Sequence, residues 1–297
     1  MTLLDALKKP VLKIQANQYY LHKKYKSALK IYLKLLESAI KNKDDEDVAC
    51  FHEKTADCYE KLDHKTKDEM HNDHEKAGEH YIKSAEKHQM LGSYEKAAEI
   101  YEKGAYAFEE LHRHADAARF YLKSSVMFKQ IGDLFNSSYT LHTAAKYFER
   151  AHELEKAGEA YLEAASLDLK VKDKATASLN FKKAAACYEK AKRHEDAIDA
   201  LADSIELDSI THKYLDVGDT YEKMAQSYAK LENNKDAAYY FEKSAQLREK
   251  NKDLTQAAEA YVEAALIYED QNKIGEALKA LSKAEAHYRK DKAHGKL

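Results

Sequence analysis

Apolar positions recur along this chain at a fixed step of twenty residues. Residues 94–111 show the unit, YEKAAEIYEKGAYAFEEL. Stepping by twenty from residue 77 to residue 277 gives A, A, A, S, A, A, A, V, A, A, A, and stepping from residue 81 to residue 281 gives Y, Y, Y, L, Y, F, L, Y, F, Y, L. Eleven units keep this register without an insertion or deletion. A fixed period of this kind is typical of stacked repeat architectures.

Each unit carries one apolar stripe with helical spacing. Ala97, Tyr101, Gly104 and Phe108 lie at positions i, i+4, i+7 and i+11, so they share one face of a helix. Small residues on this face let neighbouring backbones approach closely, and the aromatic residue fills the remaining gap. A heptad coiled coil, the main alternative, would show no helix-ending residue every twenty positions. The stripe therefore predicts helices of about 17 residues that bury their apolar faces against the next repeat.

The residues between the stripes predict turns of three residues. The column from residue 92 to residue 272 contains glycine twice and His, Lys or Asn in most other copies, which suit the left-handed position that ends a helix. The following column supplies side chains that commonly cap the next helix: Ser93, Asp133, Asp173, Asn233 and Asp253. Because the turns are this short, consecutive helices are expected to be antiparallel neighbours.

The repeat predicts an all-α, right-handed α-solenoid of about fourteen antiparallel helices. One 20-residue unit forms one helix, two units form a 40-residue helical hairpin, and the solenoid extends over residues 1–297 as a single domain. Residues 1–62 are expected to form three helices. Residues 63–74 shift the phase of the repeat by nine residues, which indicates an irregular connection or an extended helix end. Strict repeats then fill residues 75–290, and residues 291–297 form a basic tail.

Composition supports helix nearly everywhere and distinguishes the two ends of the chain. There are eight glycines and one proline, Pro10, which suits the first turn of a helix, so we expect the first helix to begin near it and to end near Tyr20. Residues 1–44 carry +7 and residues 274–297 carry +3. Since the whole chain has a net charge of −3, the span between them carries −13.

Several classes of function are disfavoured by the same data. An acidic middle offers no continuous basic face for nucleic acid. No glycine-rich phosphate loop, GxSxG sequence or cofactor fingerprint is present, so we expect neither an enzyme nor a cofactor. Cys50, Cys58 and Cys187 cannot all pair and match no metal motif, which favours reduced thiols in a cytoplasmic protein. No apolar run approaches the length of a signal peptide or a membrane span.

Three polar clusters are candidate sites. Four lysines at the start of the chain favour peripheral contact with an anionic membrane or an acidic partner, although a solvated capping repeat would look the same: Lys23, Lys24, Lys26 and Lys30. An acidic helix could receive a basic partner or be a solvated face: Glu195, Asp196, Asp199 and Asp203, together with Glu206 and Asp208. His71 and His74 could offer two nitrogens to a metal ion, but no cysteine lies nearby, and we expect surface histidines and no metal site.

The forty-residue hairpin resembles the tetratricopeptide class of helical repeat. Longer hairpins with Ala-Ala and Tyr columns look like the soluble NSF attachment protein (SNAP) family, and three segments carry this similarity: YKSALKIYLKLLESA, YEKAAEIYEKGAYAF and AAEAYVEAALIYED. The resemblance implies a non-enzymatic scaffold that grips a helical bundle of the SNARE type and recruits an AAA+ ATPase in intracellular membrane traffic. The family's ATPase-contacting residues are not carried over, because RKDKAHGKL stands in place of its acidic tail. A generic tetratricopeptide-type adaptor or regulatory sensor with another partner is the alternative.

Overall fold

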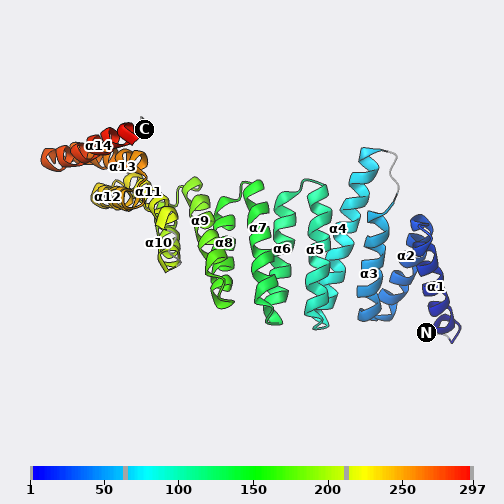
Figure 1. Cartoon of the computed structure of the whole chain (residues 1–297). Coiled ribbons are helices and arrows are strands. Elements are labelled where there is room, and N and C mark those ends of the chain that lie inside the picture. Colours follow the sequence, from blue (N-terminus) through cyan, green and yellow to red (C-terminus); the bar gives the residue numbers. More distant parts are fainter. Residues whose placement is uncertain (1–2, 63–65, 211–213, 295–297) are drawn as a thin grey trace. The chain divides into compact units, whose positions relative to one another are not determined.

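In the computed structural model, the described residues, 3–62, 66–210 and 214–294, form fourteen helices and no strand. The predicted all-α helical-repeat fold is therefore confirmed. Residues 1–153 and 154–297 form two compact units, and consecutive helices within each unit lie side by side (Figure 1). That the two units continue as one uninterrupted solenoid stays a prediction.

Each unit contains seven of the helices found in the described residues. The first unit comprises α1 (Leu3–Leu21), α2 (Tyr25–Asn42), α3 (Asp45–Glu60), α4 (Lys67–Met90), α5 (Tyr94–Glu110), α6 (His114–Gln130) and α7 (Leu134–Arg150). The second comprises α8 (Leu154–Lys170), α9 (Lys174–Lys190), α10 (His194–Ile210), α11 (Tyr214–Lys230), α12 (Asn234–Lys250), α13 (Leu254–Asp270) and α14 (Ile274–His294). Helices α5 to α13 each have 17 residues, the length that the repeat predicts.

The turns between helices have the backbone conformation that their column predicts. Gly92 and Gly132 have φ angles of 75° and 79°. Non-glycine residues in the same column also have positive φ: His112, His152, Lys172, Lys192, Glu232, Lys252 and Asn272. A left-handed residue at this place ends the helix and reverses the chain, and it costs a residue with a Cβ atom roughly 1 kcal/mol.

Four of the five predicted caps are present, and Ser93 is the exception. Asp133 accepts a hydrogen bond from the Asn136 amide at 3.1 Å, and Asp173, Asn233 and Asp253 make the same contact with the amide three residues ahead. The Ser93 side chain makes no capping bond. The serine hydroxyl oxygen lies one bond closer to the backbone than a carboxylate oxygen does. Thr66 has a hydroxyl at the same distance from the backbone and caps α4, but from an extended backbone at φ −132° and ψ 159°.

The two ends of the chain differ from the predicted boundaries. Pro10 lies inside α1, which begins at Leu3, so the predicted start at the proline is wrong. Lys9, beside the proline, forms ion pairs with Asp44 and Asp47, and these hold the helix against α3 despite the missing amide. At the other end, α14 continues to His294, so residues 291–294 of the predicted tail are helical.

Most of the predicted irregular connection belongs to α4. This helix begins at Lys67, so the extended helix end is the correct alternative for residues 67–74. Asp68 and Glu69 in its first turn favour the helix start electrostatically. Residues 63–65 lie outside the described residues.

The core is built from alanines and large side chains that face small ones. Ala97 and Ala98 are fully buried, and Tyr101 is 1% exposed. Gly78 on α4 lies under the Phe108 ring on α5, where an added Cβ atom would approach the ring to 2.8 Å. Close contact between neighbouring helices therefore depends on small residues at this position of the repeat.

Candidate interaction surfaces

The four N-terminal lysines surround the turn between α1 and α2. Lys23 and Lys24 are in the turn, and Lys26 and Lys30 lie one helical turn apart on α2. All four are exposed, and none forms an ion pair with another described residue. They therefore present uncompensated positive charge to the solvent.

The aromatic residues beside these lysines belong to the core of the first unit. Tyr19 and Tyr20 pack against a buried cluster that includes Tyr32 and Phe51, and the Tyr20 ring contacts the Tyr25 ring at 5.4 Å. Leu21 alone of the three apolar residues near the turn is strongly exposed. Any contact with a membrane at this turn would consequently rest mainly on charge.

The acidic residues of α10 differ in their exposure and in whether they have an ion-pair partner. Glu195, Asp199 and Asp203 are exposed, whereas Asp196 pairs with Arg193 at 2.7 Å. Asp208 is only 1% exposed, so its predicted place on an acidic surface is wrong.

Asp208 is a core residue because α9 supplies partners for its charge. The Ser178 hydroxyl donates to one carboxylate oxygen at 2.7 Å, and Lys182 Nζ lies 2.6 Å from the other. Burying a carboxylate is tolerated only when it is paired and hydrogen-bonded, and both conditions are met here.

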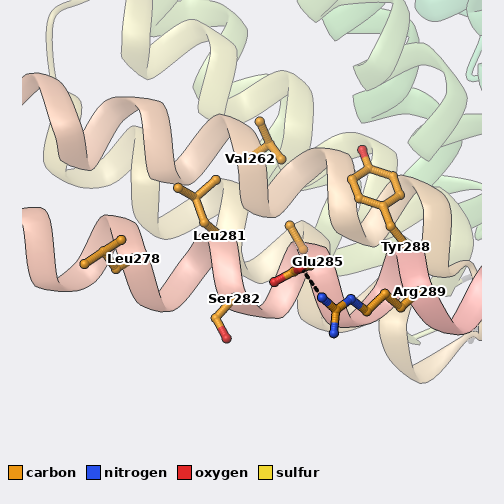
Figure 2. A pocket seen from close by; sticks show the side chains of 8 residues that line it. Val262, Leu278, Leu281, Ser282, Glu285, Tyr288 and Arg289 are labelled. Carbon is orange, nitrogen blue, oxygen red and sulfur yellow. Dashed lines mark hydrogen bonds and ion pairs between the residues drawn. The ribbon is translucent and has the colours of Figure 1, made fainter.

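The outer face of α14 has an apolar hollow that sequence reasoning missed. A cavity of about 720 Å³ is lined by Val262 of α13 and by Leu278, Leu281, Ser282 and Tyr288 of α14, among others (Figure 2). Leu278 is 62% exposed. An ion pair of 2.6 Å between Arg289 and Glu285 borders the hollow. The signal for this site was the unbroken apolar column at residue 281, which the repeat pattern assigned to a buried face.

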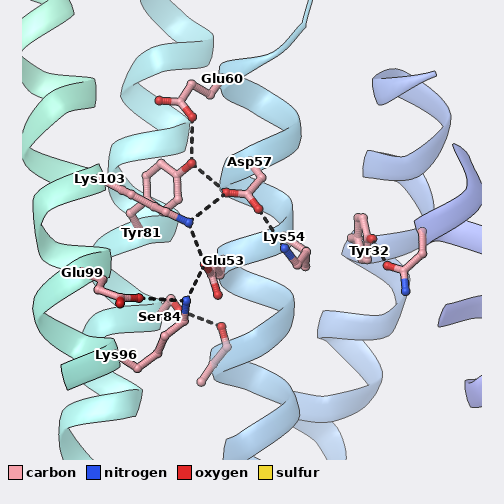
Figure 3. Close-up of polar contacts among 12 residues, drawn as sticks. Tyr32, Glu53, Lys54, Asp57, Glu60, Tyr81, Ser84, Lys96, Glu99 and Lys103 are labelled. Atoms are coloured by element: carbon pink, nitrogen blue, oxygen red, sulfur yellow. Dashed lines mark hydrogen bonds and ion pairs between the residues drawn. The ribbon is translucent and has the colours of Figure 1, made fainter. Parts of the chain in front are cut away.

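A charged network joins α3, α4 and α5 (Figure 3). Lys103 of α5 donates to Glu53 of α3 at 2.8 Å and lies 3.7 Å from Asp57. The Tyr81 hydroxyl of α4 lies 2.9 Å from both the Asp57 and Glu60 carboxylates. Lys96 also reaches Glu53, at 3.2 Å.

The electrostatics of this network are those of a structural ion-pair cluster. Burial by itself raises the pKa of Glu53, but the ammonium groups of Lys103 and Lys96 outweigh it, and the net pKa is lowered. Burial likewise opposes the charge of Lys103, yet Glu53 and Asp57 leave its pKa raised. Both groups are thus held in their charged forms, and neither is suited to transferring a proton near neutral pH.

Two histidines, the buried His52 and the partly buried His80, form a pair between α3 and α4. His52 Nδ1 lies 2.8 Å from His80 Nδ1. Burial, together with the other ring and Lys83, lowers the pKa of His52 to about 4, and burial and Lys83 lower that of His80 to about 4. Both rings are therefore neutral at pH 7.

The described residues around His71, His74 and Cys58 form neither a metal site nor a reactive thiol. His71 and His74 lie on α4, and within the described residues no group of three or more His, Cys, Asp or Glu is placed to hold a metal ion. Cys58 is buried, and burial raises its pKa to about 12, which keeps the thiol protonated. No helix in the described part of the chain is sufficiently long and apolar to cross a membrane.

Antiparallel helices in twenty-residue units, with variable charged and apolar patches on their exposed faces, define a tetratricopeptide-like helical repeat scaffold for protein interactions. The model of the family "Soluble NSF attachment protein, SNAP" matches residues 133–209 and 207–294, which together are more than half of the chain. The chain belongs to the soluble NSF attachment protein family.

Three solved structures are similar at low sequence identity. A putative kinesin light chain from Podosopora anserina with nearly identical TPR-like repeats has 14% identity over 72% of this chain and 95% of its own, with a TM-score of 0.45. A signal transduction ATPase with a tetratricopeptide repeat sensor from Pyrococcus horikoshii has 15% identity over 97% of this chain, with a TM-score of 0.45, and this chain spans 47% of its length. Aspartyl phosphate phosphatase F from Bacillus subtilis has 13% identity over 84% and 73% of the two chains, with a TM-score of 0.40. No curated protein matches.

Proposed function

We propose that this chain is a non-enzymatic adaptor of the SNAP type in the cytoplasm. It grips a helical bundle of the SNARE type and recruits an AAA+ ATPase to that bundle in intracellular membrane traffic. The observation that carries the proposal is the family match over residues 133–294, which includes every helix of the second unit.

The N-terminal lysines are the proposed electrostatic contact of this adaptor. Lys23, Lys24, Lys26 and Lys30 are exposed and uncompensated by described residues, so an acidic helical bundle or an anionic leaflet would meet no competing carboxylate. Each lysine near an anionic membrane surface contributes roughly 1 kcal/mol, and the contribution falls as salt is added.

The hollow on α14 is a proposed docking place for a protein partner. A contiguous exposed apolar patch on the surface of a protein marks a candidate interaction site. Leu278, Leu281 and Tyr288 supply this patch.

A reconstituted disassembly assay tests the adaptor role. The chain is mixed with a purified four-helix SNARE-type bundle and an NSF-type ATPase, and release of labelled bundle helices is followed with and without ATP. We expect release only when chain, ATPase and ATP are all present. Absence of both bundle binding and ATPase binding would overturn the SNAP-type role.

Charge reversal tests the lysine surface in the same assay. Replacing two lysines, K23E with K26E, is expected to weaken bundle or vesicle binding at least tenfold at low salt. The matched control, K250E with K252E, changes exposed lysines of α12 and its following turn and is expected to leave binding unchanged. Equal losses in both variants would show that only net charge matters.

A generic tetratricopeptide-type adaptor or regulatory sensor is the second candidate. It is favoured by the acid-rimmed groove between α8 and α10, whose charge suits a basic partner. Affinity purification from native cytosol followed by mass spectrometry separates the two candidates, because the SNAP-type role requires an AAA+ ATPase among the captured proteins.

A further inference from the structure

A groove runs between α8 and α10 on the surface of the second unit. It encloses about 440 Å³, which lies within the range of ligand pockets. Its lining comes from α8, α9 and α10: Leu162, Ser166, Leu169, Phe181, Asp203, Glu206 and Leu207. The two outer helices form its walls, and α9 contributes to the floor through Phe181.

The floor of the groove is apolar. Phe181 and Leu207 are buried in one small cluster, and Leu162 packs against that cluster while remaining partly exposed. Leu169, on the α8 wall, is 39% exposed. An apolar side chain placed here would be removed from water on several sides, which contributes about 25 cal/mol per Å² of apolar area.

The α10 wall is acidic and lacks cationic partners. Asp203 and Glu206 line the groove, and Asp199 lies one helical turn before Asp203 on the same exposed face of α10. None of these three acids forms an ion pair with a described residue. Lys182 of α9 is engaged elsewhere, with Asp208 at 2.6 Å and Asp216 at 3.9 Å.

Mutual repulsion makes this wall receptive to positive charge. Burial, Glu206 and Asp199 all raise the pKa of Asp203, and no cation offsets them. A lysine or arginine brought next to the three carboxylates would relieve their repulsion and would form charge-assisted hydrogen bonds.

We propose that the groove formed by α8, α9 and α10 binds one amphipathic helix of a partner protein, whose apolar stripe is flanked by lysine or arginine. The apolar stripe fills the floor at Leu162, Phe181 and Leu207, and the basic residues meet Asp199, Asp203 and Glu206. Docking of an amphipathic helix into an apolar groove is a common mode of recognition. The three acids span about 10 Å of helix, so basic residues on two successive turns of the partner helix can reach them. The inference concerns this groove alone and does not depend on the proposed SNAP-type role.

Designed peptides test the proposal on the full chain. The probe is a fluorescein-labelled, Leu-rich amphipathic peptide of about 18 residues with lysines beside its apolar stripe. A matched peptide has glutamate in place of each lysine, and a third has the lysines kept and the leucines replaced by serine. Fluorescence anisotropy is expected to show saturable binding of the first peptide, with at least tenfold weaker binding of the other two.

Two pairs of variants locate the binding site. D199K with D203K is expected to weaken binding of the basic peptide at least tenfold, and L169S at least threefold. The matched controls are E259K with E263K, which reverses two exposed acids at the same spacing on α13, and L179S, which truncates an exposed leucine outside the groove. The controls are expected to bind like the unchanged chain.

Circular dichroism of each variant checks that the helices remain folded. We expect every variant to fold, because all the substituted residues are exposed. Equal binding of the basic and acidic peptides, or equal losses in the variants and their controls, would overturn the proposal. A second copy of the chain as the occupant would also overturn it, and would appear in analytical ultracentrifugation as a concentration-dependent dimer that D199K with D203K abolishes. Failure of SNARE-type bundle disassembly, in contrast, would leave the peptide result unchanged.

Discussion

Some small residues in this chain face side chains that lie thirty positions further along. Gly78 faces Phe108, and Gly158 faces Tyr188. Where the small residue is Ser178, the residue thirty positions on is Asp208, and the two are hydrogen-bonded. In each pair the two residues lie on consecutive helices and contact each other. Size and polarity are therefore matched residue by residue across the helix–helix contact.

Gly158→Ala is predicted to destabilise the second unit although alanine is the better helix former. An added Cβ atom would come within 2.6 Å of the Tyr188 ring, which is buried and cannot move away freely. We expect a net loss of about 1–2 kcal/mol, since overpacking outweighs the propensity gain. Urea unfolding measures it. In the control, Gly275→Ala, the Cβ atom enters open space, and stability is expected to be unchanged or slightly raised.

Tyr101→Ala is predicted to cost roughly 3–5 kcal/mol, because the ring is almost fully buried. Tyr121 occupies the same column of the repeat, which predicts an equal loss. The structure lowers that expectation to roughly 2 kcal/mol, because the Tyr121 side chain is only partly buried. Denaturant midpoints of the two variants provide the comparison, and equal midpoints would contradict it.

At the scale of helices, the α3–α5 network holds together elements that are not consecutive in the chain. Glu53 on α3 forms ion pairs with both Lys96 and Lys103 of α5. The network is partly buried, so the cost of breaking it exceeds that of a surface ion pair.

Lys103→Met is expected to destabilise the first unit by about 2 kcal/mol, because Glu53 loses one of its two cationic partners in a buried position. The matched control is Lys123→Met, one repeat further on. Lys123 pairs with Glu86 at 3.2 Å, and both side chains are about half exposed, so the expected loss is within about 0.5 kcal/mol. Thermal unfolding of both variants decides the matter; similar shifts would show that the network adds nothing beyond a surface pair.

At the scale of the whole molecule, acidification is predicted to weaken the first unit. His52 and His80 have folded-state pKa values of about 4, below the ordinary value near 6.5 that applies to the unfolded chain. The unfolded chain therefore binds more protons as the pH falls below 6.5, and stability is lost progressively down to about pH 4. Burial also lowers the pKa of His88, which acts in the same direction.

Between pH 7 and pH 5 we expect a loss of about 3–4 kcal/mol in the first unit, roughly 2 kcal/mol from each ring. Hydrogen exchange of the α3 and α4 amides measures it, with the α12 and α13 amides of the second unit as an internal reference. Replacing one ring, as in His52→Gln, is expected to reduce the pH dependence. An unchanged pH dependence in this variant would exclude the histidine pair as its cause.

The candidate surfaces could be predicted only in part from the sequence. The N-terminal lysines and the acids of α10 were visible as charge runs, but the apolar floor beside Asp203 was not, since Leu162 and Phe181 belong to other helices. Asp208 was indistinguishable from its exposed neighbours on α10, because its partners Ser178 and Lys182 lie on α9. The hollow on α14 was not predicted either, because the repeat pattern places the residue-281 column on a buried face, whereas Leu281 is 43% exposed.

The sequence by itself determined the twenty-residue helical unit, the left-handed residue that ends each helix and the small-residue face on which the helices pack. These features depend on local backbone preferences and on side-chain volume, which every copy of the repeat carries within its own twenty residues. The tertiary structure alone decided which charges are buried, how α1 passes through Pro10, and where an acidic wall adjoins an apolar floor. Those outcomes depend on contacts between helices, so they are decided by residues from different helices that come together only in the folded chain.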